Sequence, residues 1–221
     1  MGRFFLIDAL VAAALLALWY FSLAHYNRHK GTKALRWVEE ACSGRGRIVE
    51  ARWFGSCRLQ ARMGFAANWL ENARVTVLLT PRPIPFQWFL SIWRKQKETL
   101  TFEADLDYIP GFQLEVHRHH WLTHKRRAGT VGKNWSITRP GPVVLTTRTQ
   151  WTQELAPVVN ALMMSRGHNL LSVQFRSESP QLAATVALDA LSGQESAASF
   201  LNMVHDLATG ASTSRQSSPD Q

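Results

Sequence analysis

The beginning of the chain is almost uniformly apolar. Residues 4–24 contain only two polar side chains that interrupt the run, Asp8 and Ser22. As a helix this run is about 30 Å long, close to the thickness of a bilayer core. Trp19 and Tyr20 lie near its C-terminal end, where aromatic side chains favour the membrane–water interface. The pattern predicts a single uncleaved transmembrane anchor, and a cleaved signal peptide is the alternative.

After the anchor, the pattern changes to the period-two alternation of half-buried strands. In residues 98–108 every second side chain is apolar and the intervening ones are polar. Pro110 and Gly111 then favour a tight turn, which predicts a hairpin with residues 112–122. Strands are also expected at residues 47–54, 57–63, 73–79, 143–148, 170–175 and 182–188.

Helical spacing of apolar residues appears in three segments, residues 33–42, 155–162 and 192–210. The last begins with a capping box, Ser192 and Glu195, and we expect it to end at Gly210. Its apolar face consists of Ala197, Phe200, Leu201, Val204 and Leu207.

Hairpin-linked strands with interspersed helices indicate an α+β domain with a mainly antiparallel sheet. The predicted organisation is a transmembrane anchor at residues 1–25, a basic linker at 26–34, the α+β domain at 35–209 and a disordered tail at 210–221.

One short aromatic segment, Pro83 to Trp93, has two interpretations. Eleven residues are too few to span a bilayer, so the segment is either a core helix that covers the sheet or a helix that lies in the membrane interface. Phe86, Phe89, Leu90 and Trp93 share one helical face, which favours the core. The candidates for membrane contact are Trp88, Phe89, Ile92 and Trp93.

The charge of the chain favours anionic partners. Its 221 residues carry a net charge of +9, which attracts lipid headgroups, nucleic acid or acidic proteins. Four basic residues follow the anchor and only Arg3 precedes it, so the positive-inside rule predicts a cytoplasmic C-terminal domain. The four residues are Arg28, Lys30, Lys33 and Arg36.

Basic residues also gather in a long polar loop at residues 123–142. No acidic residue occurs between His117 and Gln153. A surface of this kind suits anionic lipid, whereas the recognised spacings of nucleic-acid-binding modules are missing, which makes nucleic acid an unlikely partner. The expected contacts with an anionic surface are Arg118, Lys125, Arg126 and Arg127.

A weak metal-site pattern accompanies the predicted hairpin. His117 and His119 share one strand face, and the expected pairing places Glu103 opposite His117. Imidazole and carboxylate groups are suitable ligands for zinc or non-haem iron. A solvated sheet face has the same composition, however, and it is the interpretation that we favour.

These patterns favour a protein without catalysis or cofactor, because the sequence contains none of the nucleotide-binding, zinc-protease or serine-hydrolase motifs. The expected function is a membrane-anchored interaction or assembly domain whose partners are the bilayer and another protein. A metal-dependent hydrolase that uses Glu103, His117 and His119, and a membrane tether that binds nucleic acid, are the alternatives.

Overall fold

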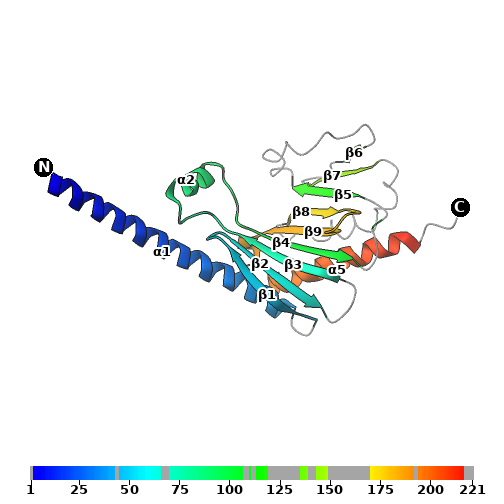
Figure 1. Ribbon diagram of the computed structural model, residues 1–221. Coiled ribbons are helices and arrows are strands. Elements are labelled where there is room, and N and C mark those ends of the chain that lie inside the picture. Colours follow the sequence, from blue (N-terminus) through cyan, green and yellow to red (C-terminus); the bar gives the residue numbers. More distant parts are fainter. Residues whose placement is uncertain are drawn as a thin grey trace.

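The computed structural model combines a long N-terminal helix with an antiparallel sheet and two further helices, as Figure 1 shows. It describes residues 2–42, 45–65, 70–106, 110, 113–118, 135–138, 143–148, 170–191 and 194–216. Helix α1 spans Gly2–Ala41, α2 spans Pro85–Trp93 and α5 spans Gln194–Gln216, with a short 3-10 helix, η3, at Leu188–Leu191. The predicted α+β class is confirmed.

Within the described residues, nine strands form one sheet in which every pairing is antiparallel. Their order across the sheet is β1-β2-β3-β4-β9-β8-β5-β7-β6. The strands are β1 (Gly46–Phe54), β2 (Arg58–Phe65), β3 (Leu70–Leu78), β4 (Thr99–Leu106), β5 (Leu114–Arg118), β6 (Trp135–Thr138), β7 (Val143–Arg148), β8 (Leu170–Phe175) and β9 (Leu182–Ala187).

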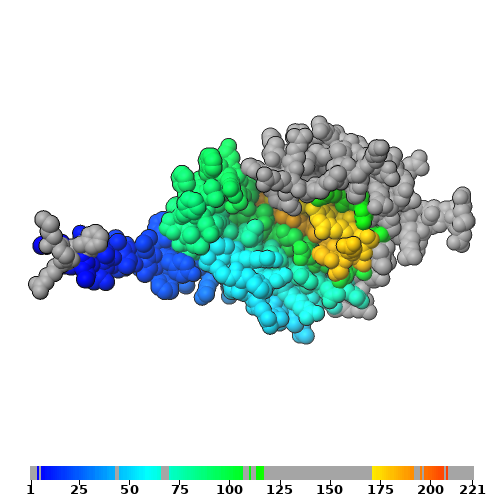
Figure 2. All heavy atoms as spheres, turned by 45° about the horizontal axis from the view of Figure 1, so that its top comes forward, coloured from blue at the N-terminus to red at the C-terminus, as the bar shows by residue number. Residues whose placement is uncertain are grey.

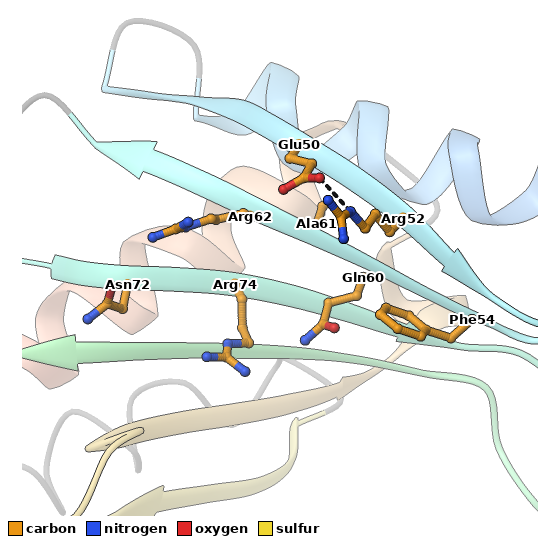
Figure 3. A pocket seen from close by; sticks show the side chains of 8 residues that line it. All are labelled: Glu50, Arg52, Phe54, Gln60, Ala61, Arg62, Asn72 and Arg74. Atoms are coloured by element: carbon orange, nitrogen blue, oxygen red, sulfur yellow. Dashed lines mark hydrogen bonds and ion pairs between the residues drawn. The ribbon is translucent and has the colours of Figure 1, made fainter.

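The core lies between one face of this sheet and two helices. Alternate residues of β2, β3 and β4 are buried, including Leu59, Val75 and Phe102, because a pleated strand sends every second side chain to the same face. These side chains pack in one cluster with the C-terminal part of α1 and with α5. The opposite face of β1–β4 carries mainly polar side chains and is the one seen from the front in Figure 3.

The predicted hairpin between residues 98–108 and 112–122 is wrong. Strand β4 pairs with β3 and β9, whereas β5 pairs with β7 and β8, so two strands separate β4 from β5. Alternation shows which side chains of a strand are buried, but it does not show which strands pair with its two edges. Several strands of this chain could have paired with β4. One of its two partners, β9, lies about 80 residues further along the chain, so a local turn motif could not indicate this pairing.

Two helices extend further than the sequence suggests. The expected linker at residues 26–34 is helical throughout, so α1 passes from the apolar run into the domain without a break. Gly31 is tolerated inside the helix because Trp53 packs against it, and an added Cβ would lie 2.7 Å from that ring. Helix α5 continues beyond Gly210 to Gln216.

Between β5 and β8 the structure differs from the sequence-based expectation in one described element. Strand β6 lies inside the stretch 123–142 that was expected to be a loop. The helix expected at residues 155–162 falls outside the described residues.

Candidate membrane-contact site

The two halves of α1 have different surroundings. The side chains from Leu6 to Ser22 are exposed, whereas Ala34, Leu35 and Val38 are buried in the core of the domain. Among the described helices, α1 is the one that is long and apolar enough to cross a membrane, and none of its most apolar stretch is buried within the protein. The N-terminal half is therefore a candidate span that projects from one end of the domain (Figure 1).

A buried asparagine marks the point where the exposed half of α1 meets the domain. Asn27 is fully buried, and its Nδ2 donates hydrogen bonds to the backbone oxygens of Ser56, at 3.1 Å, and Thr80, at 3.0 Å. Its Oδ1 accepts a hydrogen bond of 2.9 Å from Nη1 of Arg82. The amide thus joins α1 to the β1–β2 turn and to the segment that leads into α2.

Glu98 completes this junction. Its carboxylate lies 2.5 Å from Nζ of Lys30 and 2.7 Å from Nη1 of Arg82, and it accepts hydrogen bonds from the backbone nitrogen and hydroxyl of Thr80. Burial by itself would raise the pKa of Glu98, but the hydrogen bonds from Lys30 and Thr80 and the charge of Arg82 outweigh it and hold the pKa below its ordinary value. The carboxylate of Glu98 is consequently charged at neutral pH.

Helix α2 lies at the same end of the domain. Pro85 occupies its first turn, where a missing N–H is harmless, and Lys95, the second residue after the helix, has a φ of +49°. The ring centroid of Trp88 lies 5.5 Å from that of Trp19, inside the apolar run of α1. In Figure 2, α2 forms a green projection beside the blue of α1.

The apolar side chains of α2 do not cover the sheet. Phe86 is 75% exposed, Phe89 70%, Ile92 56% and Trp93 75%. The core interpretation of this segment is therefore wrong, because the stripe that suggested it points away from the domain. Trp88 is half-buried against α1, and Ser91 is the buried residue of the helix.

The β1–β2 turn adds apolar surface that the sequence analysis missed. Phe54 is exposed, the guanidinium of Arg58 lies 5.9 Å from the centre of its ring, and Leu78 is exposed next to Arg58 in the sheet register. The contact of Ser56 with Asn27 places this turn beside α1 at the base of the span. Phe54 follows Glu50 and Arg52 on the polar face of β1. An aromatic residue at a position where polar residues are expected was the sequence signal that could have revealed this apolar surface.

The predicted polar sites lie elsewhere or outside the described residues. Glu103 pairs in register with Arg74 and Ala183, while the backbone of His117 pairs with Val144 and Ser172, so the expected alignment of Glu103 with His117 is not formed. The structure does not describe the side chains of His117 and Arg118. Residues His119, Lys125, Arg126 and Arg127 lie wholly outside the described ranges.

No protein-family model matches the chain, and no curated protein matches it either.

Proposed function

We propose that the protein is a single-pass membrane protein whose α+β domain acts as a cytoplasmic interaction or assembly module, held against the bilayer by α2. The contact between Trp88 and Trp19 carries this proposal, because it brings the exposed apolar side chains of α2 alongside the candidate span. A domain that rests on the membrane in one orientation presents its remaining surface to partners in a defined way. This use requires no catalytic group.

The depth of α2 supports a membrane contact. If residues 4–24 cross the bilayer core, Trp19 lies five residues before the end of the span, or about 7.5 Å inside it at 1.5 Å per residue. Interfacial helices bury their apolar face about 5–10 Å into the boundary between headgroups and acyl chains. Trp88 therefore lies at the depth where such a helix is stable.

The charges next to α2 fit the same placement. Arg94, Lys95 and Lys97 follow the helix and are exposed, so they can reach lipid phosphates from a helix that is embedded at headgroup level. The basic residues after the span, which outnumber Arg3, support a cytoplasmic domain by the positive-inside rule. The basic loop, Lys125, Arg126 and Arg127, remains a further predicted contact with anionic lipid.

Site-directed spin labelling tests the proposal. Ile92→Cys and, as a matched control, Glu195→Cys are introduced into full-length protein in which both native cysteines are alanine, and the labelled protein is reconstituted into nanodiscs. Both positions are exposed helix surface, one on α2 and the other at the start of α5. We expect the label at residue 92 to be accessible to oxygen dissolved in the bilayer and shielded from a water-soluble nickel complex, and the label at 195 to show the reverse.

Equal accessibility of both labels to the nickel complex would contradict the membrane placement of α2. A carbonate wash tests the anchor separately, since a spanning helix keeps the protein in the membrane pellet. Protease treatment of sealed inside-out vesicles tests the orientation: the domain is digested if it faces the cytoplasm.

A further inference from the structure

The open face of the sheet contains a pocket that shares Phe54 with the membrane-contact site and otherwise lies outside it. It is hollowed over β1, β2 and β3, has a volume of about 450 Å³ and includes Arg52, Arg62 and Arg74 in its lining. We call it the arginine pocket. Figure 3 looks onto it, with α1 and α5 behind the strands.

The register of the strands brings the arginines together. Glu50 pairs with Arg62 and Arg62 with Arg74, while Arg52 pairs with Gln60 in the next row. Bulges flank β2 on both sides, one in β1 near Glu50 and one in β3 at Asn72, whose φ is +48°. Bulges bend a strand and redirect its side chains, so they are consistent with a hollow at this point of an otherwise regular sheet.

The pocket has more positive charge than its own carboxylate can balance. Glu50 is the acidic residue of the lining, and its Oε1 lies 2.5 Å from Nε of Arg52 (Figure 3). Arg74 reaches Glu103 only at 3.9 Å, and within the described residues the guanidinium of Arg62 has no hydrogen bond or ion pair. Two guanidinium groups on adjacent strands are thus available to an anion, and arginine binds carboxylates through two parallel N–H donors.

A hydroxyl group beside the pocket also lacks a partner. Oγ1 of Thr76 is buried and has no hydrogen-bond partner in the described part of the chain. Thr76 is the register partner of Gln60, whose side chain lines the pocket. Buried polar atoms are nearly always bonded in folded proteins. Thr76 does not itself line the pocket, however, so its hydroxyl is not part of the surface that a ligand would meet.

We infer that the arginine pocket binds an acidic, extended segment of a protein partner. The inference rests on the proposed function, since it names the partner chemistry of that interaction domain. An open hollow of this size accommodates several side chains, and an extended peptide sends every second one to the same face. Two carboxylates at that spacing would meet Arg62 and Arg74, and the residue between them would point away from the sheet. Glu50 and Glu103 flank the two arginines in the same cross-strand row, so the positions beyond these carboxylates should be uncharged.

Two other anionic ligands fit the pocket less well. Strand β1 begins beside Cys42 and ends at the turn beside Asn27, so β1 and β2 run along α1, away from the base of the span. Arg62 is four residues from the start of β2, or about 13 Å along the strand at 3.3 Å per residue, which is beyond a Debye length of about 8 Å. Arg52 lies nearer the turn but is already paired with Glu50. Nucleic acid would bring closely spaced phosphates against Glu50 and Glu103.

A peptide titration tests this inference. The probe is a fluorescein-labelled decapeptide that contains Glu-Thr-Glu flanked by threonines, added to full-length protein in phosphatidylcholine nanodiscs and, in parallel, in detergent; binding is followed by fluorescence anisotropy. The reference probes are the same peptide with glutamine for glutamate and an oligothymidine of equal charge. We expect the acidic peptide to bind best.

The variants locate the binding. Arg62→Gln should weaken it about tenfold, the equivalent of one strong charge-assisted contact, and Arg62→Lys should weaken it less because the charge remains. Arg36→Gln is the matched control, because Arg36 is exposed on α1, far from the pocket. The substitution removes the same charge and should change the affinity less than about twofold.

Three results would overturn the inference. They are equal or undetectable binding of the acidic and glutamine peptides, equal losses in Arg62→Gln and Arg36→Gln, and tighter binding of oligothymidine than of the acidic peptide. Because the titration is also made in detergent, it does not depend on α2 reaching the bilayer. A failure of the membrane proposal would leave its outcome unchanged, and the reverse also holds.

Discussion

Helices α2 and α5 carry apolar stripes of similar spacing but use them in opposite ways. On α5, Ala197, Phe200 and Val204 are buried, and Phe200 is 1% exposed. On α2, Phe86 and Phe89 follow the same spacing and remain largely exposed. Helical periodicity therefore identifies an amphipathic helix without identifying what covers its apolar face. In this protein one helix face is covered by the sheet, and we propose that lipid covers the other.

The largest effect should come from emptying the buried stripe. Phe200→Ala removes a fully buried ring and should lower the free energy of unfolding by about 3–5 kcal/mol. Thermal unfolding of the full-length protein in detergent, followed by circular dichroism, measures the change. Phe86→Ala, the same deletion on α2, is the control and should change stability by less than about 0.5 kcal/mol. A similar loss in both variants would mean that α2 also stabilises the folded domain.

A smaller effect is expected at the junction where Glu98 joins α1 to the domain. Glu98→Gln keeps the shape of the side chain but leaves Lys30 and Arg82 without their carboxylate, which should cost about 2–3 kcal/mol at pH 7. Chemical unfolding at a series of pH values measures it.

The pH dependence of this variant has a defined sign. The folded-state pKa of Glu98 lies below the ordinary value of 4.5, so its contribution is complete above about pH 4.5 and is lost as the pH falls through the folded-state pKa. The difference between wild type and Glu98→Gln should therefore shrink in acid. A difference that is constant from pH 7 to pH 3 would show that the carboxylate charge does not stabilise the junction.

Gly31→Ala separates helix propensity from packing. In an exposed helix this change stabilises by about 1 kcal/mol. Here the new methyl group would lie 2.7 Å from Trp53 and 3.2 Å from Leu59, so we expect a net loss of about 1–2 kcal/mol in thermal unfolding. His29→Ala, at an exposed position of the same helix, is the control. Stabilisation by Gly31→Ala would show that Trp53 moves aside easily and that α1 is loosely packed.

The smallest effect on stability is expected where the effect on membrane contact is largest. Phe89→Ser should change the free energy of unfolding in detergent by less than about 0.5 kcal/mol, because the ring is already exposed. In nanodiscs the same substitution should make a spin label at residue 92 more accessible to the nickel complex. If the label is unaffected, Phe89 does not help to hold α2 in the bilayer.

The sequence was sufficient to identify most strands and helices but not their neighbours. Residues 98–108 and 170–175 were recognised as strands because their side chains alternate or form a short apolar run, and β4 and β8 match them closely. The pairing of β4 with β9 depends on a contact between residues 99–104 and 182–187, and local sequence carries no information about such a distant partner. The incorrect hairpin with β5 was predicted because Pro110 and Gly111 favour a tight turn and the nearby sequence offered no other partner for β4.

The candidate site was predicted in part, and the reason is similar. The four aromatic and aliphatic residues of α2 were identified from composition, but a choice between core and surface requires knowing which face of the helix meets Trp19. Asn27 gave no indication of its importance, because a polar residue after an apolar run is expected in solvent. Its burial results from the approach of Ser56, Thr80 and Arg82, three groups at least 29 residues away in the chain.

The unbroken course of α1 has a mechanical consequence. At 1.5 Å per residue its 40 residues form a rod about 60 Å long. One end packs against the domain, and under the proposed placement the other end spans the bilayer. Transmembrane helices tilt by about 20° on average and adjust that angle to the thickness of the surrounding lipid. Such a tilt displaces the far end of the rod sideways by about 20 Å. Under the proposed placement the domain turns with α1, so a change in membrane thickness that alters this tilt also changes how deeply α2 lies in the interface.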